Sequence, residues 1–360
     1  MARFGWKGSG IAMFHWRSET RARAWWGRRF RLPAGSCRLV AVACLAAGLA
    51  GSQQQPVFRA NVNLVHVVTT VKNQAGELVG SLKKEDFEIT DNGVRQEVAV
   101  FERVTEQPIS VALLIDTSGT TGKDLKYETD SASRFLRALL AEGSPKDVVQ
   151  LYSVNADVRV LCDFTHSYTQ LIQPFRLLHS EGATALFQSI AWASQALEKR
   201  DGRKVILLVT DGDDTYSRIT APQALEAAQL ADAIVYSVVV VPITNPAGRM
   251  IGGEHALMYM ADGTGGRVFM PTLGPEMDKA FADIVSELRT QYMLGFYPHN
   301  APLTKDRFHK LQVKVNRPEL QVSSRNGYYG DSEGATGAAD ARTAVVPENV
   351  RTLPEKTKKR

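Results

Sequence analysis

The stretch SVALLID at residues 110–116 is an almost uninterrupted apolar run that ends in an aspartate. Such a run is typical of a strand that is buried on both faces of a parallel sheet. Two similar runs follow, KVILLVT at residues 204–210 and AIVYSVVVV at residues 233–241. Helical patterns separate these runs. The alternation predicts a doubly wound, mostly parallel α/β domain over residues 107–289.

The segments on either side of this domain have β patterns. Residues 57–106 contain β-branched and apolar runs around Asp91-Asn92-Gly93, a hairpin turn signal. Residues 290–330 return to alternating apolar and polar positions. Because neither segment supplies many strands, we expect the two to pair into one small β-sandwich into which the α/β domain is inserted. Residues 331–360 are rich in Gly, Ala, Glu and Lys, which predicts a disordered tail.

The first 51 residues have the composition of a secretory signal peptide. The apolar run at residues 39–51 contains no charge, but it is too short to cross a bilayer. Basic residues precede it and small residues end it, as in an export signal. We therefore expect the protein to be secreted, or to lie in the periplasm or cell envelope, with no membrane span in the mature chain.

The placement of charge argues against nucleic-acid binding. The whole chain of 360 residues has a formal net charge of +5, with 43 basic and 38 acidic residues. Residues 1–50 hold nine Lys or Arg and one Glu, so the remainder has 34 basic and 37 acidic residues. The basic character therefore belongs to the leader. Hydrophobic residues make up 44% of the chain, which is an ordinary globular value and excludes a multi-span membrane protein.

Three loops of the α/β domain carry oxygen-bearing side chains. These candidate ligands are Asp116, Ser118, Thr120, Thr184 and Asp211. The loops that follow the parallel strands share the carboxyl edge of the sheet, where open α/β folds bind ligands. All the donor atoms are hard oxygens, which suit Mg²⁺, Mn²⁺ or Ca²⁺ better than Zn²⁺ or Cu²⁺. Any one loop alone would be explained by helix capping, but three in this order predict a metal site.

Asp213 and Asp214 extend the last of these loops. An EF-hand interpretation of DGDDTY fails, because Tyr216 stands where that motif has Gly and Pro222 stands where it has Glu. We expect the two aspartates to form an acidic rim or to cap the following helix. Direct ligation of the metal is the alternative.

Asp-x-Ser-x-Thr, a distant Thr and a later Thr-Asp-Gly resemble the metal-ion-dependent adhesion site of von Willebrand factor A domains. The resemblance covers residues 108–290 and extends to the VWFA-related Acidobacterial domain family over residues 57–328. The motifs LKKEDFEITDNGVRQEV, DTSGT, GATAL, VTDGDDT, TGGR, LGFYP and RNGYY stand in the family's order. The resemblance implies that the five candidate ligands hold the metal, some through water. It also implies a non-enzymatic protein that binds a partner's Asp or Glu carboxylate. Thr120 departs from the usual Ser, and Thr121 replaces a commonly apolar residue.

Two other functions compete with adhesion. The run LLIDTSGTT also resembles the nucleophile loop of haloacid-dehalogenase-type phosphotransferases, in which Asp116 would attack phosphorus beside Mg²⁺. Ser118 cannot supply the general acid that such enzymes place there, and their Lys would have to be Lys199 or Lys204. A Ser hydrolase would need a His base, and no His lies in a recognisable motif. The other alternative is a structural scaffold with an inactive metal site.

Overall fold

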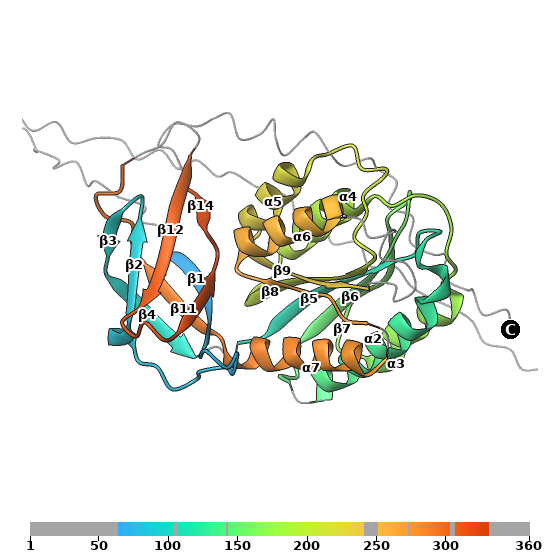
Figure 1. Ribbon diagram of the computed structural model, residues 1–360, viewed down its shortest axis with the longest axis horizontal. Coiled ribbons are helices and arrows are strands. Elements are labelled where there is room, and N and C mark those ends of the chain that lie inside the picture. The colour runs from blue at the N-terminus through green and yellow to red at the C-terminus, as the bar shows by residue number, and fades with distance from the viewer. Residues whose placement is uncertain are drawn as a thin grey trace, which may run out of the picture. The chain divides into compact units, whose positions relative to one another are not determined.

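A six-stranded sheet forms the centre of the α/β domain in the computed structural model (Figure 1). The model describes residues 64–103, 107–141, 143–240, 251–272, 274–302 and 307–330, so the expected leader and tail lie outside the described residues. The strand order is β10-β9-β8-β5-β6-β7. The strands are β5 (Ile109–Asp116), β6 (Val148–Val154), β7 (Arg159–Thr165), β8 (Arg203–Thr210), β9 (Ala233–Val239) and β10 (Arg267–Phe269). All pairings are parallel except that of the edge strand β7 with β6. The expected mostly parallel α/β fold is confirmed.

Helices cover both faces of this sheet (Figure 1). On one face lie α2 (Leu125–Ala141), α3 (Tyr168–Ile172) and α7 (Pro275–Thr290), and on the other lie α4 (Leu186–Glu198), α5 (Ala221–Leu230) and α6 (Ile251–Thr264). The two faces have separate apolar cores because the central strands are buried on both sides. The rings of Phe135 and Phe281 pack 5.3 Å apart and join α2 to α7. Among the described residues, no helix is both long and apolar enough to cross a membrane.

The flanking segments form two further sheets, with strand orders β13-β1-β11-β4 and β14-β12-β2-β3. The N-terminal strands are β1 (Val65–Lys72), β2 (Phe87–Asp91), β3 (Val94–Gln96) and β4 (Val98–Arg103). The C-terminal strands are β11 (Tyr292–Phe296), β12 (Phe308–Val315), β13 (Gln321–Ser324) and β14 (Gly327–Tyr329). Each sheet combines strands from both segments, and one apolar core joins the two sheets. The expected sandwich is therefore confirmed.

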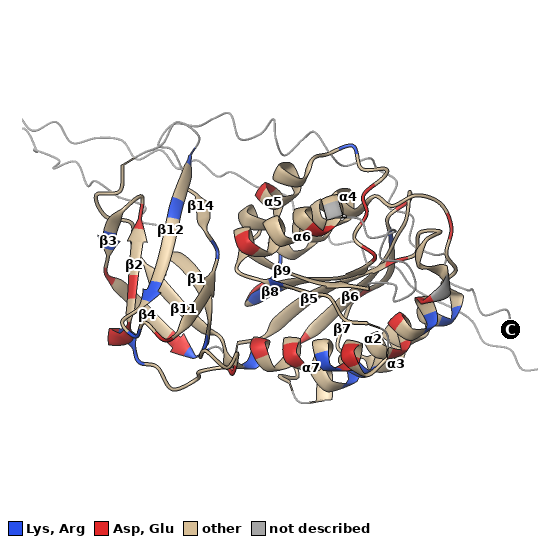
Figure 2. Cartoon of the chain, in the orientation of Figure 1, with Lys and Arg blue, Asp and Glu red and all other residues tan. Residues whose placement is uncertain are grey.

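The connection from α7 to β11 is a single buried residue, Gln291. Its amide nitrogen donates to the hydroxyls of Thr70 (3.2 Å) and Tyr236 (3.1 Å). Helix α7 carries several acidic residues along its length (Figure 2). One of them, Glu287, is buried and pairs with Lys72 of β1 and with Arg267 of β10. Strand β1 of the sandwich is thus held by both an amide and an ion pair.

Three helices would not have been placed correctly from the sequence pattern alone. Helix α6 begins at Ile251 and therefore includes Gly252 and Gly253, although glycine disfavours helices. A Cβ on Gly253 would lie 1.6 Å from the carbonyl oxygen of Gly212, so glycine is required here by close approach and not by a turn. The short helix α3 and the 3-10 helix η4 (Pro174–Leu177) were not expected at all.

Candidate metal centre

Asp116 ends β5 and is almost completely buried, with 1% of its surface exposed. Its carboxylate is held by two donors. The backbone N–H of Ser118 donates to Oδ1 over 2.8 Å, and the hydroxyl of Thr210 donates to Oδ2 over 2.7 Å. Thr210 ends β8, which lies beside β5 in parallel register, so the sheet itself places this hydroxyl next to the carboxylate. Thr210 is the threonine of the Thr-Asp-Gly motif, but it was not among the five predicted ligands.

The first loop turns back on itself beside Asp116. The hydroxyls of Ser118 and Thr120 lie 3.1 Å apart, with Ser118 buried and Thr120 exposed. The hydroxyl of Thr121 donates to the carbonyl oxygens of Asp116 (3.2 Å) and Ser118 (3.0 Å). This explains why a polar residue is accepted at the buried position 121. The turn therefore brings three of the five predicted ligands together.

The Thr184 loop lies between the other two loops. The N–H of Gly119 donates to the carbonyl of Gly182 over 3.0 Å, and Gly182 has a φ of +75°, which glycine adopts without strain. On its other side, the N–H of Thr184 donates to the hydroxyl of Thr215 over 3.0 Å. The carbonyl of Thr184 accepts from the N–H groups of Thr215 and Tyr216. The buried Thr184 is thus fixed to both aspartate loops.

The third loop begins with Asp211, a half-buried residue directly after β8. Asp214 acts as a helix cap, because its Oδ2 accepts from the N–H of Phe187 over 2.7 Å in the first turn of α4. Its Oδ1 accepts from the N–H of Ser217 over 3.0 Å. The prediction of a cap is correct in kind, but the capped helix is α4 and not the following helix. Thr220 begins the following helix, α5, with a capping box.

The electrostatics of this site are dominated by buried negative charge. The pKa of Asp116 is raised to about 6, mainly by burial and in part by the Asp211 carboxylate, although the hydrogen bonds from Thr210 and Ser118 act in the opposite direction. Burial and then Asp211 also raise the pKa of Asp213. The charged groups that act on these two aspartates are carboxylates. A cation at this edge of the sheet would relieve their repulsion.

Glu128 is a buried acidic residue of this region that the sequence interpretation missed. It lies in the first turn of α2 with 1% of its surface exposed. The sequence does contain a signal for its burial. Glu128 stands three residues after Leu125 and therefore lies on the apolar face of the helix.

The donor set fits a hard cation. Within the described ranges, no three His, Cys, Asp or Glu side chains are grouped so as to hold a metal on their own. A metal bound here would need the hydroxyls of Ser118, Thr120 and Thr184, or water, in addition to the carboxylates. Hydroxyl and carboxylate oxygens are the ligands of Mg²⁺, Mn²⁺ and Ca²⁺.

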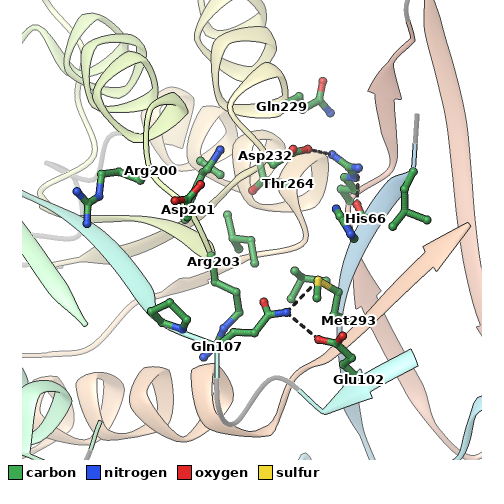
Figure 3. Close-up of a pocket in the computed structure, with 18 of the residues that line it drawn as sticks. His66, Glu102, Gln107, Arg200, Asp201, Arg203, Gln229, Asp232, Thr264 and Met293 are labelled. Carbon is green, nitrogen blue, oxygen red and sulfur yellow. Dashed lines mark hydrogen bonds and ion pairs between the residues drawn. The ribbon is translucent and has the colours of Figure 1, made fainter. Parts of the chain in front are cut away.

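A cavity of about 680 Å³ lies elsewhere, at the amino ends of β8 and β9 (Figure 3). His66 and Met293 line it from the sandwich, and Arg203 and Asp232 line it from the α/β domain. Arg325 crosses it, donating to Asp232 over 2.5 Å and to the carbonyl of His66. The cavity is at the opposite edge of the sheet from Asp116, so it plays no part in the candidate metal centre.

Part of this chain is similar in sequence to known proteins. Residues 111–213 match the family model of the von Willebrand factor type A domain. Cuticlin-6 of Caenorhabditis elegans is 30% identical over 221 residues, which are 57% of this chain and 35% of the cuticlin. The matched region therefore spans about a third of that relative.

Two solved structures show similarity at low sequence identity. The vWF domain of the type V pili tip protein Mfa5 from Porphyromonas gingivalis is 15% identical, with a TM-score of 0.42 over 50% of this chain and 95% of that one. The conserved hypothetical protein BatB from Bacteroides thetaiotaomicron is 17% identical, with a TM-score of 0.41 over 50% of this chain and 98% of that one. The family match agrees with the sequence motifs and with the strand order, and it shows that this chain contains a von Willebrand factor type A domain, matched over residues 111–213.

Proposed function

We propose that this chain is an exported, non-enzymatic binding protein that recognises a carboxylate of a protein partner through a divalent cation. The proposed ligands are Asp116, Ser118, Thr120, Thr184 and Asp211, and the proposed ion is Mg²⁺, or Mn²⁺ or Ca²⁺ in its place. The observation that carries the proposal is the Asp116 carboxylate, which is buried and is held by a backbone N–H and a hydroxyl, with further carboxylates as its charged neighbours. Burying an ion is costly unless an opposite charge accompanies it.

The solvent exposure of the proposed ligands supports binding of a partner that approaches from solvent. Asp116 and Thr184 are buried, Asp211 is half-buried and Thr120 is exposed, so the donors extend from the interior to solvent. Two carboxylates and three hydroxyls supply few charged ligands to a divalent ion. A partner's carboxylate would complete such a shell and be held by direct charge attraction.

The phosphotransferase alternative is disfavoured by the positions of the two candidate lysines. Lys204 is paired in register with Ser110, six residues before Asp116, which corresponds to about 20 Å along a strand. Lys199 is the C-cap residue of α4, whose other end follows Thr184. A helix of this length separates its ends by about 20 Å. Both lysines therefore lie toward the opposite edge of the sheet from Asp116.

A peptide array tests the proposed recognition with the full chain. The array carries Asp- and Glu-containing peptides, each beside a copy in which Asn or Gln replaces the acid, and it is probed in Mg²⁺ and in EDTA. We expect binding to a subset of acidic peptides only, in Mg²⁺ only, and its loss in Asp116→Ala. Binding that survives EDTA or the exchange of the acid for its amide would contradict the proposal.

A turnover assay separates adhesion from phosphoryl transfer. We expect no metal-dependent hydrolysis of p-nitrophenyl phosphate and no beryllium fluoride adduct at Asp116. Hydrolysis that requires metal and disappears in Asp116→Asn would establish the phosphotransferase instead.

A further inference from the structure

We infer that Glu128 is a third carboxylate of the proposed metal centre, which acts on the cation by accepting a hydrogen bond from its bound water. The inference rests on the proposed function and extends the site beyond the three loops. The starting observation is that Glu128 is almost completely buried and that its Oε2 has no hydrogen-bond partner in the described part of the chain. A buried carboxylate oxygen without a partner is costly, so its retention needs an explanation.

The position of Glu128 is set by the first turns of α2. The chain from Ser118 runs through a succession of backbone hydrogen bonds, from Thr121 to Ser118, from Asp124 to Thr121 and from Glu128 to Asp124. Glu128 therefore lies three turns beyond Ser118, on the helix that follows the first ligand loop after a short 3-10 turn at Thr121–Lys123. Its side chain belongs to the buried face of α2, together with Leu125 and Ala132, and this face is turned toward the sheet that ends in Asp116.

The neighbours of Glu128 are acidic. Burial raises its pKa well above the ordinary value, and the carboxylates of Asp116, Asp124 and Asp211 act in the same direction. Two of these three are proposed metal ligands. The oxygen without a partner thus lies within electrostatic range of the place where the cation would be held, and each neighbouring charge has the wrong sign to satisfy it.

A metal-bound water supplies what this oxygen lacks. Water on a divalent cation is a strong donor, and groups behind the direct ligands typically accept such hydrogen bonds and tune metal affinity. Direct ligation by Glu128 is not required, because the carboxylates and hydroxyls of the three loops already supply the proposed ligands. The position of Glu128 near the start of α2 also favours its charged form, because a negative charge is stabilised in the first turn of a helix.

Titration of the full chain with Mn²⁺ alone, followed by calorimetry and by Mn²⁺ electron paramagnetic resonance, tests this inference. Glu128→Gln removes the charge and keeps the shape, and Asp130→Asn is the matched control because Asp130 is an exposed acid on the same helix. We expect Glu128→Gln to weaken Mn²⁺ binding about 10-fold or more, the usual range for loss of such a partner. Asp130→Asn should leave the affinity within about twofold of wild type on the same scale.

The melting temperature without metal provides the second measurement. A merely structural role predicts that Glu128→Gln alters this temperature but leaves Mn²⁺ affinity and the resonance spectrum as in wild type, and that result overturns the inference. Glu128→Asp restores the charge and should recover part of the affinity; failure of this rescue would also overturn it. If wild type itself binds no Mn²⁺, the proposed function fails together with the inference. If wild type binds and Asp116→Ala does not, while Glu128→Gln equals wild type, only the inference fails.

Discussion

Replacing Asp116 with Asn should stabilise the metal-free protein and abolish its stabilisation by metal. Burial raises the pKa of this carboxyl from 3.8 to about 6. A pKa shift of one unit corresponds to about 1.4 kcal/mol. Keeping the Asp116 charge buried therefore costs about 3 kcal/mol of folding stability at neutral pH. The amide of Asn carries no charge and avoids this cost.

The net gain is smaller because one hydrogen bond is lost. Asn can still accept from the N–H of Ser118, but its NH₂ group would face the Thr210 hydroxyl, which now donates to Oδ2 over 2.7 Å. Losing a hydrogen bond of this kind costs about 1 kcal/mol. We therefore expect Asp116→Asn to be more stable than wild type by about 2 kcal/mol at pH 7 in EDTA, or roughly 4–8 °C in melting temperature for a domain of this size.

The stability of the wild-type protein should depend on pH through Asp116. The folded carboxyl holds its proton more tightly than the unfolded one, so wild-type stability falls as pH rises from 3.8 to about 6 and is then level. The advantage of Asp116→Asn should therefore be absent at pH 3.5–4 and complete above pH 6.

Thermal and urea unfolding across this pH range, in EDTA and in Mg²⁺, measure both effects. Mg²⁺ at one hundred times its Kd adds about 2.7 kcal/mol to wild type and nothing to the variant, so the order of stability should reverse. Asp130→Asn, at an exposed position, should show neither effect. A variant that is less stable than wild type in EDTA at pH 7, or a difference that does not change with pH, would refute the electrostatic explanation.

Three further changes test the loops around Asp116. Thr210→Val should cost about 1–3 kcal/mol in urea unfolding, because the Asp116 carboxylate and the Gly212 N–H both lose their partner, whereas Thr210→Ser should keep most of the stability. Gly253→Ala should weaken Mn²⁺ binding in calorimetry, because its Cβ would lie 1.6 Å from the Gly212 carbonyl and displace the loop of Asp211. Gly252→Ala, which meets open space, is its control, and equal effects of the two would contradict the packing argument. Asp214→Ala should cost about 0.5–2 kcal/mol through the lost cap on α4 and leave Mn²⁺ affinity unchanged; a large loss of affinity would make Asp214 a ligand.

The central sheet could be predicted from sequence because its strands are marked by composition alone. Every residue of β5 is buried, and the run SVALLID is accordingly apolar on both faces. The three loops could be predicted to converge for the same reason, since parallel strands bring their carboxyl ends to one edge. What was missed depends on which segments are neighbours in space. The sequence places Asp214 before α5, yet it caps α4, because the loop after β8 lies against the Thr184 loop that precedes α4.

Glu128 and Gly253 were missed for a related reason. A glutamate among the polar residues of an amphipathic helix resembles a surface position, and only its i+3 spacing from Leu125 shows that it points inward. Gly252-Gly253 resembles a loop in sequence, since glycine disfavours helices. In the fold, Gly253 belongs to α6 because the Asp211 loop approaches its backbone too closely for a side chain. Both features are consequences of contacts between segments far apart in the chain.

The two ends of β5 show how the fold treats buried carboxylates differently. At the amino end, Asp147 is fully buried, accepts from the N–H of Ile109 and pairs with Arg289 over 3.0 Å. At the carboxyl end, Asp116 is equally buried, but its partners are an N–H and a hydroxyl, and the charged groups that act on it are acidic. An arginine at this end would have neutralised the charge permanently, as it does for Asp147. A hydroxyl orients Asp116 without neutralising it, so the negative charge stays available to an exchangeable cation. The charged groups that act on Glu128 are acidic as well. The proposed metal dependence therefore rests on the groups around these carboxylates as much as on the carboxylates themselves.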